Sequence, residues 1–337
     1  MRIVTPRWWY VRGRRPMAMT RTLLRPASWI WAWATARRLA RGRPFDPGVP
    51  VICVGNLTLG GSGKTPVVRE LARRLGAAGG AVHILSRGHG GRLAGPVRVE
   101  TDIHAYAEVG DEPLMMAREA PVWVARDRAA GAAAAARAGA GLIVMDDGHQ
   151  DPTVKKALSL IVVDGETRGD EWPFGDGAVF PSGPMREPLA AGLARADAVI
   201  VLLAADAPAA DPGLLALFAG KPVLIARLEP LAPPPPGPQL GFAGVAKPWK
   251  VERALKAAGC DLVDFAPLPD HAPLSGATLR FLADRAAALG AGLITTEKDW
   301  IRLTPAWRAR VAAWPVRARF EDAAALDSLL ARATRWA

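Results

Sequence analysis

The sequence predicts an α/β protein with a doubly wound, mostly parallel sheet, a second, smaller α/β domain and an N-terminal amphipathic helix. Three observations support this fold class. Short apolar runs without polar alternation recur along the 337 residues, and such runs are typical of parallel strands covered on both faces. Helix-length segments separate these runs, as in repeated βαβ units. A glycine-rich loop also stands between the first run and the next helix, where such folds bind phosphate.

The first 45 residues are predicted to form a basic, tryptophan-rich arm. Residues 1–44 contain eleven arginines and no acidic residue. Removing these eleven from the 43 basic residues of the chain leaves 32, which equals the number of acidic residues. The formal net charge of +11 therefore belongs to the arm. A basic chain often binds nucleic acid, but the body has no excess positive charge, so we expect no nucleic-acid partner.

The helix expected in this arm is too short to cross a membrane. Its longest stretch without charge, residues 26–36, has eleven residues, whereas a span needs about 20. Indole rings favour the headgroup level of a membrane, and arginines favour anionic lipid. The arm therefore either lies on an anionic membrane surface or packs on the body with a solvated basic face. Its tryptophans are Trp8, Trp9, Trp29, Trp31 and Trp33.

Residues 46–231 are predicted to form the main domain. Helices are expected at 67–75, whose apolar residues share one face, and at the alanine-rich segment 129–138. The near-continuous apolar runs between the helices and loops indicate buried strands. The expected strands are 49–54, 81–86, 122–125, 141–145, 158–163, 198–203 and 222–227.

A proline-rich linker, residues 232–238, is predicted to join the main domain to a C-terminal α/β domain, residues 239–337. Four consecutive prolines at 233–236 favour an extended, semi-rigid segment. Apolar runs and helical patterns alternate again after the linker. The expected strands are 239–245, 262–267, 292–295 and 315–320, and the expected helices are 251–258, 279–289 and 323–334.

The glycine-rich loop resembles a nucleotide-binding P-loop, although the usual motif opens with glycine and here Thr58 holds that position. Glycines allow backbone N–H groups to converge on phosphate oxygens. Lys64 is expected to reach the β- and γ-phosphates of ATP, and the Thr65 hydroxyl to bind Mg²⁺. The sequence thus predicts a P-loop NTPase-like core. The expected nucleotide-binding residues are Thr58, Leu59, Gly60, Gly61, Ser62, Gly63, Lys64 and Thr65.

A second acidic motif supports the same prediction. The apolar run that ends at Met145 is followed by Asp146 and Asp147. Open α/β sheets bind ligands at the carboxyl ends of their strands, and a Walker-B aspartate reaches the nucleotide's metal from there. Although an Asp-Asp-Gly sequence alone often marks only a turn, its occurrence with the glycine loop favours a metal-binding role for both aspartates.

Taken together, these motifs resemble the tetraacyldisaccharide 4′-kinase family, the lipid A 4′-kinases of Gram-negative inner membranes. The similarity extends from residue 54 to residue 299, and the irregular position of Thr58 is also found in that family. The similar segments are Val54-Gly55-Asn56-Leu57-Thr58, Gly60-Gly61-Ser62-Gly63-Lys64-Thr65-Pro66, Ser86-Arg87-Gly88, Val109-Gly110-Asp111-Glu112-Pro113, Asp146-Asp147-Gly148-His149-Gln150, Pro181-Ser182-Gly183-Pro184-Met185-Arg186-Glu187-Pro188, Pro269-Asp270-His271 and Thr296-Glu297-Lys298-Asp299.

The resemblance implies a membrane-associated lipid kinase of lipopolysaccharide biosynthesis. Such an enzyme transfers the ATP γ-phosphate to the 4′-hydroxyl of a tetraacylated glucosamine disaccharide 1-phosphate. It implies ATP and Mg²⁺ as cofactors and a peripheral position at the cytoplasmic face of the inner membrane, with the arm on the anionic surface. No obligate protein partner is expected. The alternative class is a membrane-associated P-loop NTPase switch without a lipid acceptor.

The resemblance also implies roles for individual residues. Asp111 matches the catalytic base, and His271 matches the histidine that pairs with it. Because these two residues lie in different predicted domains, their meeting requires domain closure. Arg186 and Arg128 match arginines near the transferred phosphate, where a guanidinium would neutralise developing charge. Glu112 either assists the metal or caps a turn.

Some positions differ from the family pattern or have no assigned role. His149 and Asp151 flank Gln150, where the family commonly has an aromatic or aliphatic residue before the glutamine and His or Asn after it. His89 stands where tyrosine is usual. The cluster 297–299 is either structural or in contact with nucleotide.

Overall fold

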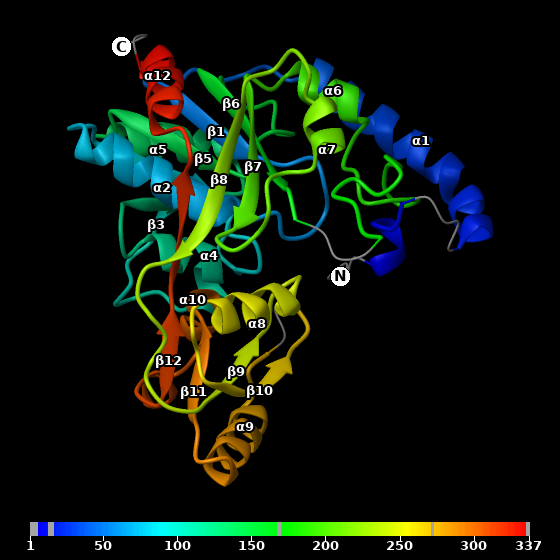
Figure 1. The fold of residues 1–337 in the computed structure, drawn as a ribbon. Coiled ribbons are helices and arrows are strands. Elements are labelled where there is room, and N and C mark those ends of the chain that lie inside the picture. Colours follow the sequence, from blue (N-terminus) through cyan, green and yellow to red (C-terminus); the bar gives the residue numbers. More distant parts are fainter. Residues whose placement is uncertain (1–5, 13–16, 167–169, 271–272, 335–337) are drawn as a thin grey trace.

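The computed structural model describes residues 6–12, 17–166, 170–270 and 273–334, and it contains a large and a small sheet (Figure 1). The small sheet lies below the large one in Figure 1. From edge to edge, the nine strands of the large sheet within these residues are β13 (Val316–Phe320), β8 (Val223–Pro230), β7 (Ala198–Ala204), β6 (Leu158–Asp164), β1 (Val51–Gly55), β5 (Leu142–Asp146), β2 (Val82–Ser86), β4 (Val122–Val124) and β3 (Val97–Arg98).

The large sheet is mostly parallel, as predicted. Only the outermost pairs, β13 with β8 and β3 with β4, are antiparallel. The strand β1 lies in the middle, with β5 on one side and β6 on the other. Because parallel strands end at the same edge of a sheet, the loops that follow β1, β5 and β6 meet there. The sequence did not predict the two-residue strand β3.

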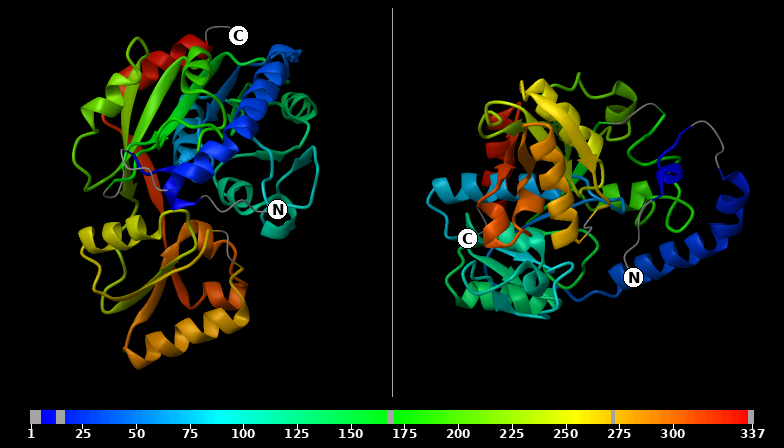
Figure 2. Two further views of the ribbon diagram at one scale, coloured as in Figure 1. Left: turned by 90° about the vertical axis from the view of Figure 1, so that its right-hand side faces the viewer. Right: turned by 90° about the horizontal axis from the view of Figure 1, so that it is seen from below.

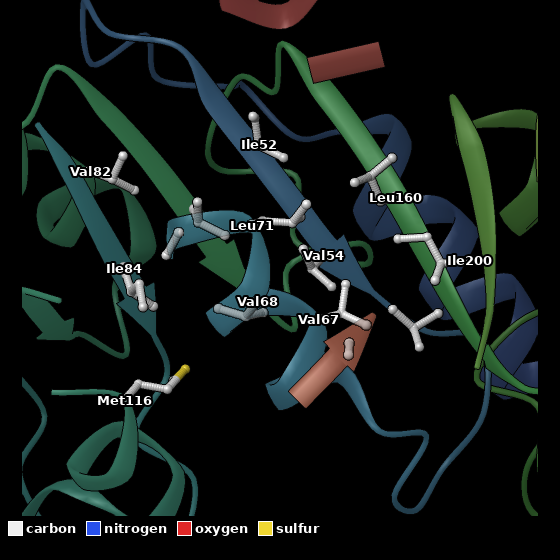
Figure 3. Close-up of a cluster of buried hydrophobic side chains, with 14 of the residues drawn as sticks. Ile52, Val54, Val67, Val68, Leu71, Val82, Ile84, Met116, Leu160 and Ile200 are labelled. Atoms are coloured by element: carbon white, nitrogen blue, oxygen red, sulfur yellow. The ribbon is translucent and has the colours of Figure 1, made fainter. Parts of the chain in front are cut away.

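Helices cover both faces of the large sheet, as a doubly wound fold requires. In β1, Ile52 and Val54 contact the helix α2 on one face (Figure 3), and Cys53 belongs to the apolar cluster of α5 on the other. The helices of this part of the molecule are η1 (Arg7–Trp9), α1 (Ala18–Ala40), α2 (Lys64–Ala77), α3 (Tyr106–Val109), α4 (Asp111–Met116), α5 (Arg128–Arg137), α6 (Leu189–Ala194), α7 (Pro212–Ala216) and α12 (Ala323–Thr334).

The small sheet forms the second domain and is parallel throughout the described residues. Its strands, in order, are β10 (Leu262–Pro267), β9 (Gln239–Ala243), β11 (Gly292–Thr296) and β12 (Val311–Trp314). Three of them were predicted. Its helices are α8 (Pro248–Ala257), α9 (Gly276–Ala288), α10 (Glu297–Trp300) and α11 (Pro305–Arg308).

The predicted C-terminal bound of the second domain, residue 337, was wrong. The strand predicted at 315–320 is β13, which pairs with β8 of the large sheet. The helix α12 then packs Leu326, Leu329 and Leu330 into the same apolar cluster as α2. After β12 the chain returns to the large domain. The segment that leaves the large domain after β8 and the segment that returns before β13 lie side by side, and the Leu231 N–H donates to the Pro315 carbonyl at 3.0 Å. The second domain therefore ends near β12.

The arm contains the expected helix, α1, which lies on the outside of the large domain (Figure 2). The two residues of α1 that are buried are polar, Ser28 and Thr35, whereas Trp29 is 70% exposed. Ser28 donates to the Val179 carbonyl at 2.8 Å, so the inner side of the helix is docked by hydrogen bonding. None of the helices in the described part of the chain has the length and apolarity that a membrane span requires.

Candidate active site

The glycine loop connects β1 to α2 at the carboxyl edge of the large sheet (Figure 1). Gly60 and Gly63 have φ angles of 95° and 77°, which residues with a Cβ rarely adopt. A Cβ on Gly63 would also lie 2.3 Å from the Leu202 side chain. The helix α2 begins immediately after Gly63, so its unpaired N-terminal N–H groups are next to the loop. This geometry suits an anionic ligand such as phosphate.

Three predicted charged residues meet beside this loop. The Lys64 Nζ atom lies 3.5 Å, and the Arg186 Nη1 atom 2.9 Å, from Asp147 Oδ1. Asp147 has a φ of 53°, a left-handed value that is uncommon outside glycine. Burial favours the neutral acid, but Lys64 and Arg186 outweigh this effect and hold the pKa of Asp147 well below its usual range. Two cations are thus held in place by one ionised carboxylate.

Asp146, the last residue of β5, is buried with an unsatisfied oxygen. Its Oδ2 atom accepts a hydrogen bond from Ser86 at 3.3 Å, but Oδ1 has no hydrogen-bond partner among the described residues. Burial, and then the charge of Glu112, raises the pKa of Asp146 to about 7. Thr65, the second residue of α2, is also buried. A carboxylate oxygen without a partner and a nearby threonine hydroxyl fit Mg²⁺, which binds oxygen ligands.

Within residues 6–12, 17–166, 170–270 and 273–334, no group of three or more Asp, Glu, His or Cys side chains has the arrangement of a metal site. Mg²⁺ commonly completes its octahedral shell with water and substrate phosphates. The donor set at the glycine loop therefore fits a magnesium ion that arrives together with a nucleotide.

Arg128 lies beneath this edge of the sheet and is almost completely buried. Its guanidinium donates to the carbonyl of Leu85 at 3.0 Å and to the carbonyl of Asp146 at 2.8 Å. It thereby joins the ends of β2 and β5. The phosphate contact that the sequence predicted for Arg128 stays a prediction; the hydrogen bonds of the structure show that Arg128 also positions the backbone of Asp146.

Arg186 is held against the glycine loop by several contacts. Its Nε atom donates to the Thr58 carbonyl at 2.9 Å, and its Nη1 atom lies 3.4 Å from Gln150 Oε1. The Gln150 amide in turn donates to Glu187 at 2.9 Å, and Arg195 pairs with Glu187 at 2.6 Å. The Pro-Met-Arg-Glu-Pro segment and the Asp-Asp-Gly-His-Gln segment are thus one hydrogen-bonded unit around the loop, a relation that their sequence separation did not reveal.

Asp111 is the first residue of α4, and its side chain is buried. The preceding Gly110 has a φ of 96°, and a Cβ there would lie 2.7 Å from the His89 carbonyl oxygen. Only glycine allows α4 to start at this point. His271 lies outside the described residues. The residue before it, Asp270, lies 3.6 Å from Lys298 Nζ, and the same nitrogen lies 3.6 Å from Glu112 Oε1.

A cavity of about 300 Å³ opens beside the glycine loop, on the β6 side. Several of the residues that line it were not predicted from the sequence. The arm contributes Tyr10, whose hydroxyl donates to the Leu59 carbonyl at 2.6 Å. The second domain contributes Lys247 and Trp249, and Lys247 forms an ion pair of 2.8 Å with Asp164 at the end of β6. No motif marks these residues, because they come from three regions that only the fold brings together.

His149 is structural in this fold. One ring nitrogen lies 2.9 Å from Ser159 Oγ and the other 3.0 Å from the Gly192 carbonyl oxygen. Burial lowers its pKa to about 4, so the ring is neutral near pH 7. A Cβ on Gly55 would lie 2.4 Å from the Cβ of His149. Asp151 accepts a hydrogen bond from the Thr153 N–H at 2.8 Å, which fits a turn.

The sequence is similar to those of a known kinase family. The sequence profile of the family described as LpxK, tetraacyldisaccharide-1-P 4′-kinase, matches residues 20–335. The chain is 70% identical over 330 residues to the tetraacyldisaccharide 4′-kinase of Phenylobacterium zucineum, covering 98% of this chain and 99% of the relative. The chain belongs to this kinase family.

Further comparisons agree with the family assignment. The Caulobacter vibrioides tetraacyldisaccharide 4′-kinase is 66% identical and covers 98% of both chains. The fold is similar to that of a crystal structure of Aquifex aeolicus LpxK in complex with ATP, with a TM-score of 0.72 and 26% identity over 94% of this chain and 100% of that one. The predicted α/β fold class and family resemblance are thereby confirmed.

Proposed function

We propose that the chain transfers the γ-phosphate of ATP to the 4′-hydroxyl of a tetraacylated glucosamine disaccharide 1-phosphate, which forms the 4′-phosphate of lipid A. The observation that carries this proposal is the meeting of Lys64, Arg186 and Asp147, beside the buried Asp146, at the glycine loop of a chain in this kinase family. Phosphoryl transfer needs mainly positioning and charge neutralisation, and this group of residues supplies both.

In the proposed mechanism, the phosphates of ATP replace the Asp147 carboxylate as the partner of Lys64 and Arg186. Lys64 and Arg186 bind the β- and γ-phosphates, and the side chains of Thr65 and Asp146 would hold Mg²⁺. When bound, the ion neutralises the charge on the phosphate oxygens. Asp111 accepts the proton of the 4′-hydroxyl as that oxygen attacks the γ-phosphorus; the bond from this phosphorus to the β–γ bridging oxygen breaks, and ADP leaves. His271 orients the carboxylate.

The nucleoside of ATP is proposed to occupy the 300 Å³ cavity. The cavity lies on the β6 side of β1, whereas Asp146 lies on the β5 side. A nucleotide whose phosphates sit on the glycine loop can therefore reach the cavity without crossing the metal side chains. Tyr10 and Trp249 offer aromatic surface there for a base.

The arm is proposed to hold the enzyme on the anionic cytoplasmic face of the inner membrane. Exposed apolar side chains on α1 include Leu23, Trp29 and Trp33, and arginines lie among them. Indole rings and arginines at one surface favour an anionic headgroup layer. The position is peripheral, and the lipid acceptor reaches the site from the same surface.

The deciding experiment is a phosphoryl-transfer assay in detergent micelles with ATP, Mg²⁺ and an acylated glucosamine disaccharide 1-phosphate. We expect ATP consumption only when the acceptor is present, and a loss of turnover in Asp111→Asn. The exposed Asp102→Asn serves as the matched control. ATP consumption that does not depend on the acceptor would instead support an NTPase switch, and full activity of Asp111→Asn would reject the proposed base.

A further inference from the structure

The short helix α10 is anchored inside the second domain by the buried side chain of Asp299. Asp299, which is fully buried, accepts hydrogen bonds from the Gly244 N–H at 2.9 Å and from the Thr296 hydroxyl at 2.8 Å. The Arg302 guanidinium lies 3.0 Å from its other oxygen. A Cβ on Gly244 would lie 2.9 Å from Asp299 Oδ1. Because these contacts lie within the second domain, they set the direction in which the neighbouring side chains of α10 point.

Two of those side chains reach the large domain. Glu297 Oε2 lies 2.6 Å from Arg69 Nη1 of α2. Lys298 Nζ lies 3.6 Å from Glu112 Oε1 of α4. One turn of helix therefore presents an anion to a cation of α2 and a cation to an anion of α4. Two pairs of opposite polarity fix the register of an interface better than one, because a shifted register would bring like charges together.

Lys298 also connects the two segments that carry the proposed acid-base residues. Its ammonium lies 3.6 Å from Asp270, the residue before His271. On its other side it reaches Glu112, the residue after Asp111. One cation thus contacts a sequence neighbour of the base in the large domain and a sequence neighbour of the histidine in the second domain.

The surroundings of Lys298 keep it charged. Burial lowers its pKa, but the nearby carboxylates of Glu112, Asp111, Asp270 and Asp299 outweigh burial and raise the pKa. An ammonium among carboxylates from both domains draws them together, and a neutral side chain in the same place would leave them to repel one another.

We propose that Lys298 is a positioning residue, which brings the start of α4 and the segment before His271 to the spacing that phosphoryl transfer needs. This inference rests on the proposed function. Lys298 transfers no proton, and it acts on the substrate only through the carboxylates that it contacts. Since the proposed ATP phosphate contacts belong to the large domain, loss of Lys298 should slow turnover far more than it weakens ATP binding.

The test uses the full-length chain in the micelle assay, with Lys298→Met, Lys298→Arg and a control, Lys256→Met. Lys256 is an exposed lysine of the same domain that pairs with Glu252 within α8. We expect Lys298→Met to lower kcat about 100-fold and to change the KM for ATP less than about threefold. The arginine variant should recover at least about a tenth of the wild-type kcat, and the control should behave as wild type.

Each result decides the inference. Unchanged kcat in Lys298→Met, a loss seen mainly in the KM for ATP, or failure of arginine to restore turnover would overturn it. Circular dichroism checks folding. If Lys298→Met does not fold, Lys298→Gln replaces it, and failure of both to fold would overturn the inference, because the lysine would then be needed for stability. A wild-type chain without acceptor-dependent activity would instead overturn the proposed function itself.

Discussion

The helices α1 and α2 differ in how much of their surface is buried by the rest of the described chain. In α2, seven of fourteen residues are buried, and Val67, Val68 and Leu71 are fully buried in the apolar cluster between α2, the large sheet and α12. In α1, two of 23 residues are buried, and both are polar. The apolar side chains of α2 therefore stabilise the fold, whereas most of those of α1 face away from it. An apolar helix surface that the described chain leaves uncovered suits contact with something else, which here is proposed to be lipid.

The arm also contacts the candidate active site. Tyr10 donates to the glycine loop, and the Trp31 indole donates to the Arg186 carbonyl at 3.0 Å. Removal of the whole arm would therefore disturb the site as well as the proposed membrane contact. Substitution of outward-facing side chains alone separates the two roles, and the predictions below are built on that separation.

The largest expected effect lies at the start of α2. Lys64→Ala should lower kcat about 1000-fold, because a cation at the transferred phosphate is lost. Binding to vesicles that contain anionic lipid should not change, since Lys64 is largely buried at the start of α2 and is not part of the exposed surface of α1. Steady-state kinetics and vesicle co-sedimentation measure the two properties. Vesicle binding that falls together with kcat would contradict the separation of roles.

The same contrast predicts unequal losses of stability. Leu71→Ala in α2 removes a fully buried side chain and should lower the free energy of unfolding by about 3 kcal/mol. Leu23→Ala in α1 changes a side chain in a residue that is 74% exposed and should cost less than about 0.5 kcal/mol. Urea denaturation of both variants provides the comparison. Similar midpoints would show that α1 packs more tightly than its exposure indicates.

The free energy of unfolding below pH 7 should include a pH-dependent contribution from the buried His149. The pKa of His149 is lowered to about 4 in the folded chain, whereas an unfolded histidine titrates near 6.5. The unfolded state therefore binds more protons between these values, and stability is lost as the pH falls. From pH 7.5 to 5 this contribution of His149 should be a loss of about 2 kcal/mol. Asp146 contributes with the opposite sign over the same range, because its raised pKa lets the folded state bind a proton that the unfolded state does not. No Asp, Glu or His precedes Asp46, so the arm adds nothing comparable from its side chains.

A variant identifies the source of that pH dependence. His149→Gln does not titrate, so the slope of the urea midpoint against pH between pH 7.5 and 5 should be less positive in this variant than in the wild type. The two slopes would be equal if other groups caused the effect.

The smallest expected effect concerns the outer surface of α1. The double substitution Trp29→Ser and Trp33→Ser should weaken binding to vesicles with anionic lipid about tenfold, since less aromatic surface enters the headgroup layer. ATP affinity should stay the same. Phe281→Ser, which changes an exposed aromatic residue of α9, is the matched control. An equal loss in the control would mean that vesicle binding is not specific to α1.

The sequence predicted the elements of the site better than their assembly. Local pattern was enough for the glycine loop and for the strand before Asp146, because both depend on neighbours a few residues apart. The sequence contains no comparable local pattern that predicts the contact of Tyr10 with the glycine loop. Arg128 was recognised as important, but its backbone contacts at Leu85 and Asp146 could be seen only after β2 and β5 were placed side by side.

What the sequence determined by itself was the fold class, the family and the phosphate loop. Periodicity, glycine placement and motif order are local properties that the chain carries before it folds. Tertiary structure alone decided that β13 and α12 return to the large domain, and that Lys298 stands between α4 and the segment before His271. These contacts join residues that are far apart in the chain, and they form because the folded state buries apolar surface and pairs charge at places that no local segment specifies.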